Sequence, residues 1–166
     1  VFDHVNTAEL RPDFIEAMVE DGQHALWIGT VHGLVTRSSA GRFRKVGADD
    51  GFRITDIQAA VRGSDGSVWI GGTGGVAHIV AGRVVRTFDH RDGLESDRVA
   101  ALAIDGADAL WIVAKGRLHR LKNGKVESFA NAAELAEDNI VRVFTNRKRQ
   151  LWALGSGGKI FTDEDG

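Results

Sequence analysis

The feature that most constrains this chain is a repeat marked by tryptophan. Within 166 residues the four tryptophans recur every 41 or 42 positions, at Trp27, Trp69, Trp111 and Trp152. Each stands second in an apolar segment that begins with Leu or Val. A unit of about 40 residues cannot bury its hydrophobic face alone and must stack on its neighbours. The chain is therefore a tandem array of four similar units.

Each unit contains the pattern of four short strands. An alternating apolar run comes about ten residues before the tryptophan, as in 54–61 and 140–144, and predicts a half-buried strand. A tight turn such as Asp65-Gly66 joins this run to the tryptophan strand, because Asp, Asn and Gly adopt the left-handed backbone of hairpin turns. A glycine-rich segment, a third strand and a second turn follow. We expect a fourth strand to end at Phe43, Phe88 or Phe129.

Four antiparallel strands per unit predict an all-β fold made of β-propeller blades. We expect about four blades, as part of a larger ring, with residues 1–166 as one propeller segment. The predicted blade repeats are 14–46, 54–88, 99–129 and 140–166, and residues 1–4 align with the end of a fourth strand as a stub. The last repeat stops where its outer strand should begin. We therefore expect self-association of two arcs, or packing against further blades of a parent chain.

Composition removes several classes of function. The 21 Lys and Arg nearly balance the 23 Asp and Glu, giving a net charge of −2. The densest basic segment, 147–149, is too short to predict a nucleic-acid interface. There is no cysteine, and the six histidines show no zinc-binding spacing. We expect neither a metal nor a cofactor. Any contact with a membrane would need segments outside this sequence, because it has no apolar run of 18 residues.

Two stretches carry a family resemblance. They are LWIGTVHGLVTRSSAGRFRKV at 26–46 and SDGSVWIGGTGGVAHIVAGRVVRTFDHRDGLESDRVAAL at 64–102. Both resemble two-component regulator propeller repeats, in which an Asp-x-x-Gly-x-x-Trp-Ile-Gly-Thr motif is followed by Gly-Gly-Leu. The second copy is very close to this pattern. The third copy replaces Gly-Thr by Val113-Ala114, and the fourth has Ala-Leu in place of Ile-Gly.

The resemblance implies a non-catalytic, ligand-sensing input module of a bacterial sensor protein. Such repeats form the periplasmic or extracytoplasmic half of membrane proteins whose output domain is a histidine kinase or a diguanylate cyclase. This chain has no kinase, nucleotide-binding or cyclase signature, so we expect no enzymatic activity in it. Two alternatives are a structural or protein-interaction platform, and a propeller lyase or glycosidase, because the Asp-Gly-x-x-Trp turns also resemble those of virginiamycin lyases.

The candidate site residues fall into two groups. Repetition inside apolar strands indicates packing between blades rather than a sugar-binding aromatic ladder for Trp27, Trp69, Trp111, Trp152, Gly29 and Gly71. In an up-and-down blade, the loops after the second strand and the connectors between blades share one face. On this loop face we expect a small molecule or glycan to contact Arg53, Thr73, Arg98, Lys115 and Arg142. We predict no catalytic residue.

Overall fold

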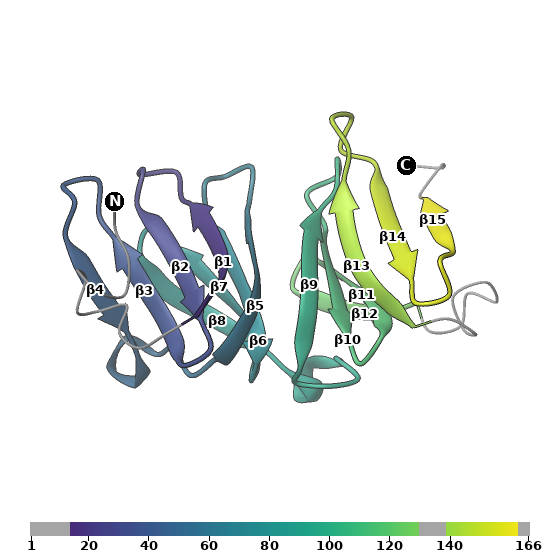
Figure 1. Ribbon diagram of the computed structural model, residues 1–166, viewed down its shortest axis with the longest axis horizontal. Coiled ribbons are helices and arrows are strands. Elements are labelled where there is room, and N and C mark those ends of the chain that lie inside the picture. The colour runs from purple at the N-terminus through teal and green to yellow at the C-terminus, as the bar shows by residue number, and fades with distance from the viewer. Residues whose placement is uncertain (1–13, 130–138, 163–166) are drawn as a thin grey trace.

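The computed structural model describes residues 14–129 and 139–162, which form four antiparallel β-sheets (Figure 1). The first two sheets consist of β1 (Ile15–Glu20), β2 (Leu26–Thr30), β3 (Gly33–Arg37), β4 (Phe43–Val46), β5 (Thr55–Arg62), β6 (Val68–Thr73), β7 (Gly75–Val80) and β8 (Arg83–Phe88). The other two consist of β9 (Val99–Ile104), β10 (Leu110–Ala114), β11 (Arg117–Lys122), β12 (Lys125–Ser128), β13 (Ile140–Thr145), β14 (Leu151–Gly155) and β15 (Ile160–Thr162). Two 3₁₀ turns, η2 (Ala48–Asp50) and η3 (His90–Asp92), lie in the connections to the second and third sheets.

Within each sheet the strands pair in chain order, as expected for propeller blades, so the predicted all-β fold class is confirmed. The fourth sheet has three strands among the described residues. The predicted end of the fourth strand is wrong in the first copy. There β4 begins at Phe43, and Val46 pairs with Leu34 as Phe88 pairs with Val76. The longer turn at 38–42 places the strand three residues later. The predicted stub at residues 1–4 lies outside the described residues.

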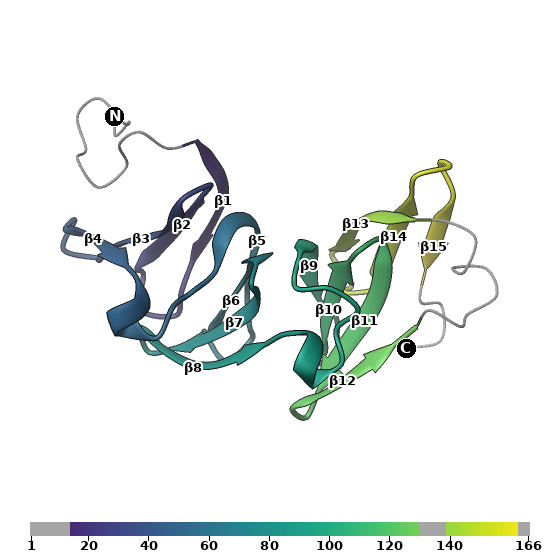
Figure 2. The ribbon, with the colours of Figure 1, turned by 90° about the horizontal axis from the view of Figure 1, so that it is seen from below.

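The sheets follow one another along an open arc, with the first sheet at one end and the fourth at the other (Figure 2). The first strand of each sheet lies on the inside of the arc, where β1 contacts β5, β5 contacts β9 and β9 contacts β13. This is the arrangement of inner strands around a propeller axis.

The hydrophobic core lies between the sheets rather than within one of them. Three clusters of buried side chains separate successive sheets, and the tryptophans belong to them in order. Trp27 lies between the first and second sheets, Trp69 packs against the cluster between the second and third, and Trp111 lies between the third and fourth. Each tryptophan therefore covers the following sheet.

Two glycines of the tryptophan strands allow this close approach. A Cβ at Gly29 would come within 2.3 Å of Ile57 Cγ2, and one at Gly71 within 2.7 Å of Val99 Cγ1. Both contacts join one sheet to the first strand of the next. A larger residue at either position would push neighbouring sheets apart.

An aspartate connects the hairpin turn to the tryptophan in the first and third sheets. Asp105 Oδ1 accepts hydrogen bonds from the backbone N–H groups of Ala107 and Ala109, at 2.8 and 2.9 Å. Its Oδ2 accepts the Trp111 Nε1–H at 2.7 Å. Asp21 makes the same set of bonds, with Trp27 Nε1 at 2.9 Å. One buried carboxylate thus fixes the turn and orients the indole.

The second and fourth sheets lack this aspartate–indole bond. Trp69 stacks on His78, with ring centroids 3.8 Å apart. In the fourth sheet Asn146 Oδ1 accepts the turn N–H groups, but its amide nitrogen donates to Gln150 and cannot accept from an indole. Trp152 Nε1 accordingly has no hydrogen-bond partner among the described residues, and its ring lies beside Phe144.

We predict that Asp105→Ala lowers the free energy of unfolding by about 3 kcal/mol, because it leaves a buried indole N–H and two turn N–H groups unpaired. Asp65→Ala, in the equivalent turn of the second sheet, is the control. There Gly63 takes the position of Asp105. Asp65 lies two residues later and accepts the backbone N–H of Ser67 at 2.9 Å instead of an indole N–H, so its loss should cost about 1 kcal/mol. Urea denaturation followed by tryptophan fluorescence measures both. Equal losses would contradict a special role for the aspartate–indole bond.

Candidate functional site

The loop after the second strand of each sheet is tied to the connector that enters the next sheet. Asp56 N donates to Val31 O at 2.7 Å, and Ile140 N donates to Gly116 O at 2.9 Å. Gly74 N and Gly75 N both donate to Asp97 O, at 2.8 Å. These bonds bring loops and connectors together at one end of the arc, the loop face.

Two of the five expected ligand-binding residues meet on the loop face. Thr73 and Arg98 form an isolated antiparallel bridge and line a cavity of about 220 Å³ with Asp56 and Gln58. The Arg98 guanidinium lies 3.6 Å from the Asp56 carboxylate, which also accepts a bond from Gln58 at 3.0 Å. This small cavity already contains a compensated pair of charges.

The other three expected residues do not line that cavity. Arg53 is exposed in the connector before β5, where its carbonyl lies close to Gly74. Lys115 is exposed in the loop after β10, in the left-handed conformation with φ 53°. Arg142 is exposed on β13, at the position that Ala17 and Ala101 occupy in other sheets.

A buried histidine positions the connector that carries Arg98. His119 on β11 is fully buried, and its Nε2 accepts the backbone N–H of Glu95 at 3.1 Å. An imidazole whose Nε2 accepts carries its proton on Nδ1 and is neutral. Burial lowers the pKa of His119 below its usual value, which keeps the acceptor available.

Asp89, His90 and Asp97 place three potential ligand atoms within 4.8 Å of one another beside this connector. Each carboxylate is already paired. Arg91 binds Asp89 and, with its backbone N–H, lowers the Asp89 pKa to about 2. Asp97 binds the His90 side chain at 2.7 Å. These bonds account for the close approach of the three side chains, which stabilise the turn η3.

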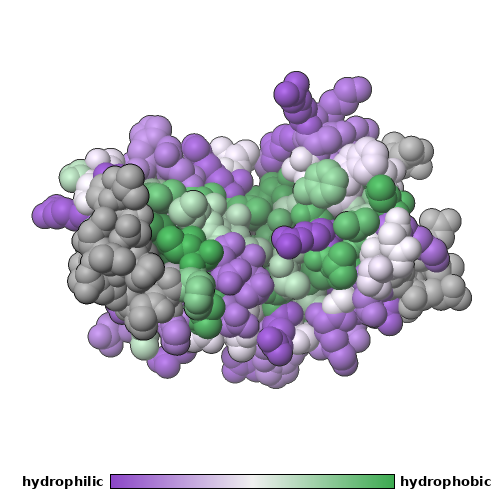
Figure 3. Space-filling model, viewed as in Figure 1, coloured by the Kyte–Doolittle hydropathy of each residue, from purple (hydrophilic) through white to green (hydrophobic). Residues whose placement is uncertain are grey.

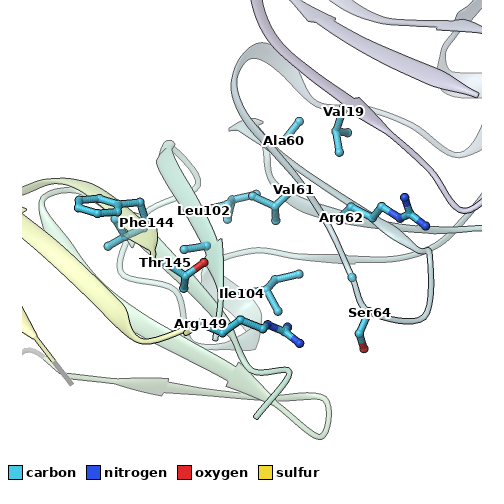
Figure 4. A pocket seen from close by; sticks show the side chains of 13 residues that line it. Val19, Ala60, Val61, Arg62, Ser64, Leu102, Ile104, Phe144, Thr145 and Arg149 are labelled. Atoms are coloured by element: carbon cyan, nitrogen blue, oxygen red, sulfur yellow. The ribbon is translucent and has the colours of Figure 1, made fainter. Parts of the chain in front are cut away.

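The larger cavity is a groove on the inside of the arc, about 530 Å³ in volume and lined by the inner strands of all four sheets (Figure 4). Its apolar lining includes Val19 of β1, Leu102 and Ile104 of β9, and Val143 and Phe144 of β13. We call this cavity the axial groove. Its size and mainly apolar lining are typical of small-molecule sites.

Polar groups gather at the turn end of the axial groove. Arg62, Ser64, Thr145 and Arg149 line it there, and in Figure 4 the Arg149 side chain extends toward Ser64. Asp108 lies 2.8 Å from Arg149 and also bonds Ser64, and both contacts lower its pKa. Arg62 has no hydrogen bond or ion pair with the described part of the chain. Arg62 is therefore a lining residue whose positive charge is not compensated by any described residue.

Sequence reasoning did not find the axial groove. Its residues come from four different repeats, and in the sequence one of them, Arg149, stands out only as part of a short basic segment. One signal is present in the sequence. The residue that pairs with the one before the tryptophan, near the end of the first strand, is Glu20, Arg62, Ile104 or Thr145 in the four copies. This position differs in every copy, whereas the tryptophan does not vary.

We predict that the protein loses stability as pH falls below about 6.5, because the unfolded chain then takes up a proton that buried His119 resists. His119→Gln should reduce this dependence between pH 7.5 and 5.5, since an amide oxygen can accept the Glu95 bond without titrating. Thermal unfolding across this range measures the slope. His24→Gln, at an exposed histidine, is the control, and an unchanged slope in His119→Gln would contradict the assignment.

No family model and no curated protein matches the chain. Solved structures do. The extracellular domain of a B. thetaiotaomicron protein assigned to the hybrid two-component systems matches with a TM-score of 0.72 and 18% identity, over 91% of this chain and 23% of that one. Virginiamycin B lyase from Staphylococcus aureus matches with a TM-score of 0.65 and 11% identity, over 90% and 55% of the two chains.

The computationally designed protein Ika4 matches with a TM-score of 0.65 and 13% identity, over 94% of each chain. In the described part of this chain, no helix is long and apolar enough to span a membrane. At these identities the matches establish the fold. The resemblance to propellers of two-component proteins is therefore confirmed in architecture, and this chain spans about a quarter of the two-component domain.

Proposed function

We propose that this chain is a ligand-sensing input module from the extracytoplasmic part of a bacterial two-component-type sensor, with no catalytic role of its own. The observation that supports it most is the fold shared with extracellular domains of two-component systems. In this proposal the output is a histidine kinase or a diguanylate cyclase elsewhere in the parent protein.

The axial groove is the better candidate for the ligand site. The loop-face cavity of about 220 Å³ is small, and its Arg98 is paired with Asp56. In the groove of about 530 Å³, Arg62 has no counter-ion among the described residues. The groove also contacts all four sheets, so a ligand there would stabilise one spacing of the sheets over others. Such differential binding is what a sensor needs to shift a conformational equilibrium.

The lining specifies a class of ligand. Aliphatic and aromatic side chains form most of the groove, and arginines stand at one end with no acidic residue in the lining. This combination favours a small molecule with an apolar body and one carboxylate or similar anionic group. A glycan, which offers many hydroxyl groups and no charge, fits this lining less well.

A lyase or glycosidase is the weaker alternative. Likeness to virginiamycin B lyase at 11% identity concerns the fold, and the groove lining offers arginines and hydroxyl groups but no paired carboxylates or histidine. A purely structural platform differs from a sensor in one measurable respect. It would gain no stability from any small molecule.

The test is a thermal-shift screen with a series of carboxylates of increasing apolar size, from acetate to octanoate and benzoate, and with neutral sugars. A ligand at 100 times its dissociation constant should raise the melting temperature by about 5–10 °C. Arg62→Ala should abolish the shift while leaving the unliganded melting temperature unchanged, because Arg62 makes no bond to the described residues.

Arg98→Ala is the matched control, since it removes the same charge from the loop-face cavity. A shift lost in Arg98→Ala and kept in Arg62→Ala would move the site to the loop face and overturn the groove. If no carboxylate or sugar stabilises the protein, the platform alternative replaces the sensor.

A further inference from the structure

Among the described residues, the fourth sheet ends the arc, and no other sheet packs against its outer surface. In the first three sheets, the surface facing the next sheet is built from fixed positions of the repeat. On the first strand these include Val19, Val61 and Ala103, each of which packs in or against a core cluster. The corresponding residue in the fourth sheet is Phe144, whose side chain is 53% exposed.

The third strand shows the same contrast. Leu34, Val76 and Leu118 occupy one position, and their exposed fractions are 2%, 0% and 5%. The corresponding Ile160 on β15 is 61% exposed. We call the surface formed by Arg142, Phe144, Trp152 and Ile160 the trailing face. It is an inter-sheet surface whose partner lies outside the described residues.

The opposite end of the arc carries the complementary surface. Ala60, Leu102 and Val143 belong to the three core clusters and face the preceding sheet, across from Val19, Val61 and Ala103. Their counterpart on β1 is Met18, which is 59% exposed, and nearby Ile15 is 45% exposed. We call the surface of Ile15, Glu16, Met18 and Glu20 the leading face.

Figure 3 shows hydrophobic surface in both halves of the molecule, over the region of β1 and β2 and over that of β13 and β14. The exposed part of the leading face is confined to the first strand, because Ile28 and Val35 in the same sheet are already buried. Any partner there must contact β1. Contacts between first strands are also how successive sheets meet within this chain.

Charge complements shape at these two ends. β1 presents the exposed carboxylates of Glu16 and Glu20, the second of which is bonded to the exposed His24 at 2.7 Å. β13 presents Arg142 where two other copies have Ala17 and Ala101. An arginine on the trailing face and glutamates on the leading face attract each other and disfavour the pairing of like ends. Because every interface in the chain joins a trailing to a leading surface, the unpaired ends should follow the same rule.

We propose that the trailing face of one copy docks on the leading face of a second copy, β13 against β1, and that a two-fold arrangement repeats this contact to close a ring of eight blades. Phe144 of one copy would lie against Met18 of the other, as Val61 lies near Leu102 within the chain. Copies that associate through unlike faces can add further copies until the assembly closes into a ring. Two arcs are the smallest such ring of more than one copy.

Light scattering over a concentration series tests this, without ligand. The 17.9 kDa chain should give twice that mass. Phe144→Lys and Met18→Lys should each raise the dimer dissociation constant about 100-fold or more, because each change enters both contacts of the ring. Val85→Lys, at a 56% exposed valine on an outer strand, is the control and should leave the mass unchanged.

Mixing the two variants distinguishes unlike from like ends. A dimer of Phe144→Lys with Met18→Lys keeps one unaltered contact, so the mixture should associate more strongly than either variant alone. If Met18→Lys leaves the dimer dissociation constant unchanged, the copies pair through the trailing face alone and the proposal is overturned. Species larger than two copies would also overturn it, as would a monomer at every concentration, which would assign the trailing face to a following blade of a longer chain. Circular dichroism confirms that each variant is folded.

Discussion

The whole architecture depends on one interaction, the packing of an indole ring from one sheet in the apolar cluster that this sheet shares with the next. Two buried aspartates, Asp21 and Asp105, hold their indoles by a hydrogen bond that also shapes the preceding turn. Local turn chemistry is thereby coupled to packing between sheets. Where the aspartate bond is absent, a different device appears, as in the stacking of Trp69 on His78. The indole is thus oriented by an aspartate in the first and third sheets and by a histidine in the second.

Much of the fold could be predicted because it depends on what the repeats have in common. The tryptophan spacing and the Asp-Gly turns were sufficient to place four sheets of antiparallel strands. The error at Phe43 arose where one copy lengthens a turn, which shifts an aromatic residue out of register without changing the pairing of Leu34 with Val46. A single aromatic residue was a weaker guide than the strand alternation around it.

The candidate site depends instead on how the repeats differ. Thr73 and Arg98 could be brought together from the sequence because a loop and the next connector always meet. The axial groove could not, since it combines residues from the first strands of four copies, where Arg62 has no partner among the described residues and lies beside apolar side chains. The loop-face prediction for Arg142 could not take account of the bulge in β13. The strand register after this bulge determines which way Arg142 points, and the sequence alone does not show it. Function in such an array is encoded in departures from the repeat.

An array of this kind has a further physical property, which is that its two ends are unlike and mutually complementary. Each internal interface joins a trailing to a leading surface, so the arc formed by the described residues has one of each at its two ends. An apolar trailing face left in water costs free energy, and the cost is removed by closing, by continuing the chain, or by binding another copy. The axial groove lies on the inside of the same arc, lined by β1 at one end and β13 at the other. Whatever completes the ring would also enclose the groove, so assembly and access to the candidate ligand site are linked by geometry.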